Sequence, residues 1–248
     1  MSLCKHCVSG VRHEGTPEGK WEKINGVDCY VATPTVEYAK EKALLFLTDI
    51  FGPQLINNQL LADDFARNGF RCIIPDMFEG DPAPEDALES GTFNIAAWFV
   101  PHGPHSARPL VDKVIAALKE EGVTSIATAG YCYGARISFD LAYENIASVT
   151  VASHPSLLQV PQDIIKYKAS KAPLLLNTCT TDPQFPIPAQ QAADMILGNG
   201  QFEPGYERTY WEGCTHGFSV RGDIKDPKVK EGKEGAFKAS VDFLFKYF

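Results

Sequence analysis

The stretch from Ser125 to Tyr143, SIATAGYCYGARISFDLAY, determines the fold class that we predict for this chain. It opens with the small and apolar residues of a buried strand and continues as a helix from residue 135. Between the two, Gly130 and Gly134 flank Cys132 in a G-x-C-x-G turn. Glycines are needed there because a side chain would collide with the neighbouring strand or helix. The sequence therefore predicts a sharp turn that lifts the Cys132 side chain to the carboxyl edge of a sheet.

Short apolar runs alternate with longer amphipathic stretches on both sides of this turn, as in a mostly parallel sheet with helices on both faces. The fold class that we predict is α/β. Strands are expected at residues 27–33, 43–47, 70–75, 125–129, 148–152, 173–178 and 207–211. Helices are expected at residues 58–67, 110–121, 135–144 and 189–197, followed by a C-terminal helix that buries Phe237, Val241, Leu244 and Phe248.

The length of 248 residues fits a single domain, in which residues 1–25 form an N-terminal arm. Residues 79–109 do not follow the alternation, because they are rich in proline and carry the aromatic residues Phe93, Trp98 and Phe99. Long segments of this kind inside a domain are usually functional or disordered. We predict an ordered lid or cap insertion here, with surface filler as the alternative.

The overall charge and the apolar pattern exclude several classes of protein. With 31 acidic and 23 basic residues the net charge is −8, which argues against nucleic acid as a partner. No apolar run approaches the roughly 20 residues that cross a bilayer, so we expect no membrane segment. Most of the seven cysteines lie in apolar runs, which indicates free thiols in a reducing compartment and a cytoplasmic protein.

The N-terminal Cys4-Lys-His-Cys7 motif has no second pair of ligands. Structural zinc requires four ligands, and completing the set with His6 and His13 would need unusually tight spacing. We therefore expect neither a metal site nor a cofactor, and an ordinary N-terminal arm in this region.

Cys132 is the candidate nucleophile. A helix N-terminus carries a partial positive charge that favours a thiolate, and the N–H of Tyr133 would point to where an oxyanion forms. The alternative is that Cys132 is a small buried hydrophobic residue and that the glycines only permit close packing.

Two further residues follow Cys132 in the order that a nucleophile, acid and base triad requires. Asp182 comes after the strand expected at 173–178, and His216 comes after the strand expected at 207–211. Ligands gather at the carboxyl ends of such strands. The alternatives are that Asp182 starts a turn, that His216 is a loop histidine, and that His154 is the base.

The segment Thr48–Gly52, TDIFG, ends the strand expected at 43–47 and offers the N–H of Ile50 as a second oxyanion donor. A carboxylate at Asp49 would oppose a developing oxyanion, so it must be neutralised or must carry a proton. Arg221 is the candidate cation, and an exposed surface arginine is the alternative.

The motifs GYCYG at 130–134, TDIFG at 48–52 and CTHGF at 214–218 resemble those of the dienelactone hydrolase family over residues 26–248. The N-terminal C-x-x-C-x-x-G-x-x-H-E-G-T-P pattern at 4–17 is similar to the fungal and related eukaryotic branch. The resemblance implies an α/β-hydrolase fold, a triad of Cys132, Asp182 and His216, and an oxyanion hole of the Tyr133 and Ile50 N–H groups. It also implies that a lactone carrying a carboxylate is opened through an acyl-enzyme on sulfur. A homodimer is a further possibility, which the sequence does not decide.

Compared with bacterial members of that family, this sequence differs at the residues that would contact the substrate. A glutamate stands in place of Asp49 in those members, where it exchanges with the substrate carboxylate to deprotonate the cysteine, and Asp49 is one methylene shorter. Those members bind the carboxylate with two arginines. Arg221 lies one residue further from the histidine than that pattern, and Arg108 at the edge of the insertion is the remaining candidate. Trp98, in the insertion, is the candidate aromatic contact.

These observations lead to one main hypothesis and two rivals. The main hypothesis is a lactone or ester hydrolase that takes a small-molecule substrate and forms a thioester on Cys132. The first rival is a general carboxylesterase or thioesterase without a lactone role. The second is a redox-sensing or binding protein that uses Cys132, or Cys4 and Cys7, as oxidisable thiols.

Overall fold

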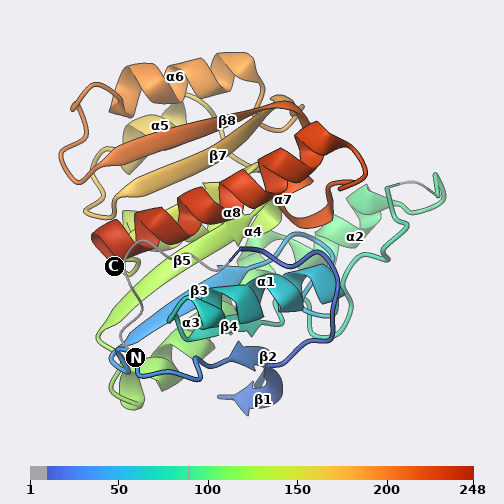
Figure 1. The fold of residues 1–248 in the computed structure, drawn as a ribbon, viewed down its shortest axis with the longest axis vertical. Coiled ribbons are helices and arrows are strands. Elements are labelled where there is room, and N and C mark those ends of the chain that lie inside the picture. The colour runs from blue at the N-terminus through green and yellow to red at the C-terminus, as the bar shows by residue number, and fades with distance from the viewer. Residues whose placement is uncertain (1–9, 89) are drawn as a thin grey trace.

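The computed structural model describes residues 10–88 and 90–248. Its centre is an eight-stranded sheet in the order β1-β2-β4-β3-β5-β6-β7-β8 (Figure 1). β1 and β4 both pair antiparallel with β2, and the six neighbouring strands β4, β3, β5, β6, β7 and β8 are parallel to one another. The bounds are β1 Lys20–Ile24, β2 Val27–Ala32, β3 Lys42–Leu47, β4 Cys72–Pro75, β5 Ser125–Tyr131, β6 Val149–Ser153, β7 Leu174–Thr181 and β8 Tyr206–Thr215.

The predicted α/β fold class is confirmed, and each of the predicted strands corresponds to one of the strands β2 to β8. The central strands β3 and β5 are buried almost throughout. Their sequences are largely apolar at consecutive positions because helices cover both faces of the sheet there. β1 lies within the predicted N-terminal arm. Its sequence, KWEKI, gave no apolar signal because the strand occupies the exposed edge of the sheet.

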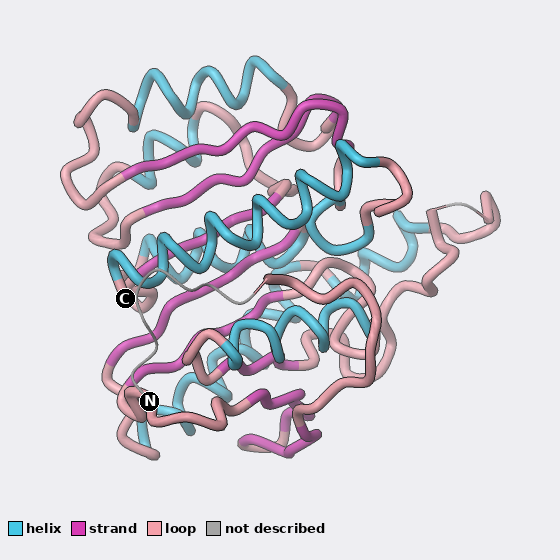
Figure 2. Tube along the Cα trace, in the orientation of Figure 1, coloured by secondary structure: helices cyan, strands magenta, loops and turns pink. Residues whose placement is uncertain are grey.

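The helices form one layer on each side of the sheet. α1 (Ile56–Arg67), α7 (Phe218–Arg221) and α8 (Pro227–Tyr247) contact one another on one side, where α1 and α8 lie across the near face in Figure 1. The other layer is formed by α3 (Pro104–Glu120), α4 (Tyr133–Tyr143), α5 (Gln162–Tyr167) and α6 (Ile187–Leu197), each contacting the next. The tube in Figure 2 shows how strands, loops and helices alternate along the chain.

The segment predicted as an insertion contains α2 (Ile95–His102), and α3 begins within it at Pro104 rather than at residue 110. The helix can begin at Pro104 because proline is tolerated in the first turn of a helix, where the missing N–H has no partner to lose. Aromatic rings hold α2 in place. Trp98 stacks on His102 with a centroid separation of 4.5 Å and packs against Phe78 at 5.1 Å.

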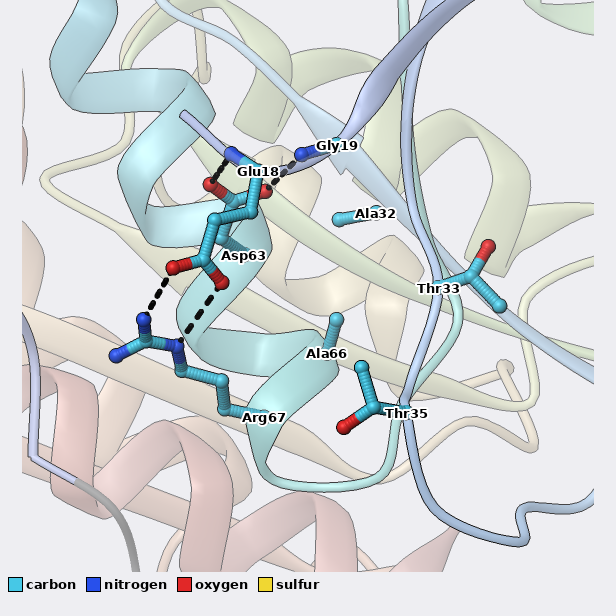
Figure 3. Close-up of a pocket in the computed structure, with 8 residues that line it drawn as sticks. All are labelled: Glu18, Gly19, Ala32, Thr33, Thr35, Asp63, Ala66 and Arg67. Carbon is cyan, nitrogen blue, oxygen red and sulfur yellow. Dashed lines mark hydrogen bonds and ion pairs between the residues drawn. The ribbon is translucent and has the colours of Figure 1, made fainter. Parts of the chain in front are cut away.

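The described part of the N-terminal arm is attached to α1 through Asp63. This buried carboxylate accepts hydrogen bonds from the backbone N–H groups of Glu18 and Gly19 and from the hydroxyl of Tyr30. Figure 3 shows the contacts of Asp63 with Glu18 and Gly19, together with the ion pair between Glu18 and Arg67, beside a cavity of about 160 Å³. The Cys4 and Cys7 pair lies outside the described residues.

No helix within residues 10–88 and 90–248 has the length and apolar content that crossing a bilayer demands.

Candidate active site

The turn that carries Cys132 has the geometry that its glycines predict. Cys132 lies between β5 and α4 with φ 50° and ψ −109°, a backbone conformation that is rare for residues other than glycine. A Cβ at Gly134 would overlap the carbonyl oxygen of Leu47, and one at Gly130 would overlap the Ser138 hydroxyl. The polypeptide can therefore turn sharply only with glycine at both positions, and the turn leaves Cys132 partly exposed.

The structure brings Asp182 and His216 to Cys132. The His216 Nε2 atom lies 3.0 Å from the Cys132 Sγ atom, and the Nδ1 atom lies 2.8 Å from an Asp182 carboxylate oxygen. Because an ionised carboxylate only accepts, Nδ1 carries the proton and Nε2 faces the sulfur. The same Asp182 oxygen accepts from the N–H groups of Gln184 and Phe185, which fixes the carboxylate at the end of β7.

The surroundings of His216 favour its charged form. Burial works against an imidazolium, but the hydrogen bonds to Asp182 and Cys132 and the charges of both groups outweigh burial and raise the pKa of His216 to about 10. An imidazolium beside the sulfur stabilises a thiolate. The pair can therefore hold a nucleophile and a proton donor at neutral pH.

The backbone hydrogen bonds around the turn leave two N–H groups available for an oxyanion. The Cys132 N–H donates to Ser153, and the Gly134 N–H donates to Thr48. Within residues 10–88 and 90–248, the Tyr133 N–H between them has no hydrogen-bond partner, and neither has the N–H of Ile50. These are the two groups that the sequence offered as oxyanion donors.

Asp49 and Arg221 form an ion pair next to these groups. The Arg221 Nε atom lies 3.0 Å from an oxygen of Asp49, whose side chain is fully buried. The guanidinium also lies over the ring of Phe51, 4.5 Å from its centroid. The other oxygen of Asp49 accepts from the Phe51 N–H at 3.3 Å and from the Asn58 amide at 3.4 Å. Arg221 thus supplies the neutralising cation that Asp49 needs.

The structure does not bring Arg108 to this site, which corrects the expectation that it contacts the substrate. It pairs with Asp112 at 2.8 Å and with Glu144 at 2.6 Å. Glu144 follows the last turn of α4, whereas Cys132 precedes the first turn of that helix. The reason is local, because Arg108 and Asp112 are four residues apart on one face of α3.

Trp98 belongs to the aromatic cluster around α2. Its side chain is 8% exposed, and its indole N–H donates to the backbone oxygen of Asp81. Phe78 lies between Trp98 and Tyr133, with centroid separations of 5.1 Å and 5.3 Å. The Tyr133 hydroxyl also donates to the carbonyl of His102. Trp98 therefore supports the residue that follows Cys132 through intervening rings.

His154 packs edge-on against His216, and the imidazole that bonds the sulfur is that of His216. The two ring centroids are 5.1 Å apart, and the Nε2 atom of His154 lies 2.8 Å from the Ser219 hydroxyl. Complete burial, together with the nearby charges of His216 and Arg221, lowers the pKa of His154 well below its usual value. A histidine held neutral in this way packs against the base without replacing it.

Sequence reasoning missed one side chain at the sulfur. The Ser156 hydroxyl lies 3.5 Å from the Cys132 Sγ atom. The residue follows the carboxyl end of β6, and that position was the only signal the sequence offered.

The strand order, the turn and the three aligned side chains define an α/β hydrolase. The model of the dienelactone hydrolase family matches residues 27–248. This chain belongs to the dienelactone hydrolase family and is a hydrolase that acts on esters or lactones.

Curated relatives match along almost the whole chain. "Hydrolase pyvD" of Aspergillus violaceofuscus is 32% identical over 97% of this chain and 95% of its own. "Dienlactone hydrolase 1" of Gibberella moniliformis is 31% identical over 98% of this chain and 92% of its own. Among solved structures, the dienelactone hydrolase from Anabaena variabilis superposes with a TM-score of 0.65 at 11% identity, over 95% of this chain and all of that one, which is a likeness of fold.

Proposed function

We propose that the protein hydrolyses an activated lactone or ester through a thioester on Cys132, with His216 as proton carrier and Asp182 as its orienting group. One observation carries the proposal. Two short contacts in series, 3.0 Å from sulfur to Nε2 and 2.8 Å from Nδ1 to the carboxylate, connect nucleophile, base and acid. This is the arrangement that activates a nucleophile in unrelated hydrolases.

In the first half of the reaction the thiolate of Cys132 attacks the carbonyl carbon of the substrate. The negative charge that develops on the carbonyl oxygen is stabilised by the N–H groups of Tyr133 and Ile50. When the carbon–oxygen single bond breaks, His216 donates its Nε2 proton to the departing alkoxide, which in a lactone stays attached to the acyl group. The product of this half is a thioester and a neutral imidazole.

In the second half His216 accepts a proton from water, and the resulting hydroxide attacks the thioester carbonyl. The tetrahedral intermediate uses the same two N–H groups. When it collapses, the thiolate of Cys132 leaves and the carboxylic acid product is released. The enzyme then regains the pair of thiolate and imidazolium with which it began, so atoms and charges balance.

The ion pair between Asp49 and Arg221 affects whether the site binds a substrate that carries a carboxylate. A substrate carboxylate can bind Arg221 in competition with Asp49, which supports a lactone that carries a carboxylate, the substrate class of the main hypothesis. A neutral ester is the second candidate. The position of Arg108 beside Glu144 favours that candidate, because it removes the second cation that a carboxylate would use.

The test of the proposed function is turnover by the Cys132→Ala variant. With a p-nitrophenyl ester and an unsaturated lactone as substrates, we expect kcat/KM to fall at least about a thousandfold. Intact mass spectrometry of the quenched wild type should show one added acyl group, located on Cys132 by peptide mapping. Cys72→Ala is the matched control, since this thiol is fully buried in β4. Activity near wild type in Cys132→Ala would refute the proposal.

A further inference from the structure

Ser156 is held against Cys132 at two points. Its hydroxyl lies 3.5 Å from the Sγ atom, within hydrogen-bond range for sulfur, and its N–H donates to the Cys132 carbonyl at 3.1 Å. The residue is 6% exposed, so the hydroxyl has little access to bulk water. The backbone contact holds the two residues side by side, which lets the side chains meet.

The backbone around Ser156 is unusual on both sides. His154 has φ 38° and Leu157 has φ 61°, so residues other than glycine adopt the left-handed region both before and after Ser156. The Leu157 side chain is 37% exposed, which means that its own burial does not explain this conformation. His154 is held by its N–H bond to the Asn177 carbonyl. Strained backbone that persists in a folded protein is concentrated at functional sites, and here it places Ser156 at the sulfur.

The direction of the hydrogen bond follows from the protons available. Because Nδ1 of His216 donates to Asp182, Nε2 is an acceptor in the neutral pair, and the Cys132 thiol donates to it as the nearer acceptor, at 3.0 Å against 3.5 Å for the Ser156 oxygen. With its proton used in this way, the sulfur accepts from Ser156. In the charged pair, Nε2 donates to the thiolate and Ser156 donates a second bond. The Ser156 hydroxyl is therefore the donor in both protonation states.

We infer that Ser156 is a further catalytic residue, whose hydroxyl stabilises the Cys132 thiolate in the resting enzyme and again when the thiolate leaves the acyl group. A hydrogen bond to a charged sulfur is stronger than one to a thiol or a thioester. The hydroxyl therefore favours the charged pair over the neutral pair. This inference rests on the proposed role of Cys132 as nucleophile.

The experiment measures the rate at which iodoacetamide alkylates Cys132 as a function of pH, because only the thiolate reacts. In Ser156→Ala we expect the alkylation profile to move to higher pH by about one unit, with an unchanged plateau, since one charge-assisted hydrogen bond is lost. The acid limb of kcat/KM should move by the same amount. At pH values below the midpoint both rates should be about tenfold lower than in wild type.

Ser153→Ala is the matched control. Ser153 is a buried serine three positions earlier, and its hydroxyl bonds to Asn177 and not to the sulfur. Its alkylation profile should coincide with that of the wild type. A Ser156→Ala profile that also coincides with the wild type would overturn the inference.

A second pair of variants separates the hydroxyl from the shape of the side chain, and covers the case in which Ser156→Ala does not fold. Ser156→Thr and Ser156→Val have nearly equal volumes and differ in the hydroxyl. We expect the threonine variant to keep its profile within a few tenths of a pH unit of the wild type, and the valine variant to shift by about one unit. Equal shifts in both variants would overturn the inference. Alkylation needs no turnover, so this result is independent of whether Cys132→Ala abolishes hydrolysis.

Discussion

The turn between β5 and α4 contains a cysteine, and so does the interior of the sheet. The two environments have opposite effects on the reactivity of the thiol. Burial is the main cause that raises the pKa of Cys29 and of Cys179 to about 12, and that of Cys214 to about 11. Cys132 instead lies partly exposed, 3.0 Å from a histidine whose pKa is raised to about 10. The same side chain is thus a packing residue in one region and a candidate nucleophile in the other. The difference comes from solvent access and from one neighbouring imidazole.

Alkylation of the folded protein gives the largest expected effect and tests this contrast directly. At pH 7 we expect iodoacetamide to modify Cys132 at least about a thousandfold faster than Cys29, Cys72, Cys179 or Cys214, because the buried thiols react only when the structure opens. Peptide mapping by mass spectrometry at several time points measures the rates. In His216→Ala the advantage of Cys132 at neutral pH should shrink sharply. Comparable rates at Cys132 and at these four buried cysteines would remove the contrast.

The next effect is a loss of activity at high pH. Acylation needs the imidazolium of His216 to donate a proton, and the pKa of this group is raised to about 10. The imidazolium is present below that pH and is lost above it, so kcat/KM should fall tenfold per pH unit beyond about pH 10. The profile should be measured with an ester that does not hydrolyse spontaneously in this range, alongside unfolding followed by circular dichroism. A fall that begins near pH 7 in folded protein would contradict this assignment.

The smallest expected effect extends the comparison to the arginines. Arg221 contacts a buried carboxylate beside the turn, whereas Arg108 pairs with the exposed carboxylate of Glu144 at the far end of α4. Arg221→Gln leaves the buried Asp49 carboxylate without its cation beside the oxyanion site, so kcat/KM should fall for both substrates. If a substrate carboxylate binds Arg221, the loss should be about tenfold larger for a carboxylated lactone than for a neutral ester. Arg108→Gln is the control and should affect neither substrate. Equal losses on both substrates in Arg221→Gln would favour the neutral ester.

Much of the site could be predicted because its signals are local. A strand, two glycines around Cys132 and a helix occupy one continuous stretch, and Asp182 and His216 each follow a recognisable strand. Parallel strands end at the same edge of a sheet, so chain order alone indicated that these side chains meet. The contact between Arg221 and Asp49 could also be predicted, because both residues follow strands that end at this edge.

Other features depended on packing that no local pattern records. Arg108 also pairs with Glu144, and only the position of α3 beside α4 decides this second contact. β1 was missed because an edge strand needs no apolar face in its sequence. Ser156 reaches the sulfur through a loop with left-handed backbone on both sides, which a sequence of ordinary residue types does not predict.

The amino-acid sequence by itself determined the alternation of strands and helices, the glycine turn and the order of cysteine, aspartate and histidine, because each can be read from short continuous stretches and from the order of those stretches along the chain. Tertiary structure decided which charges are paired, that Ser156 contacts the sulfur, and that His216 rather than His154 faces it. These depend on side chains brought together from distant segments, where burial and distance set the strength of every electrostatic interaction.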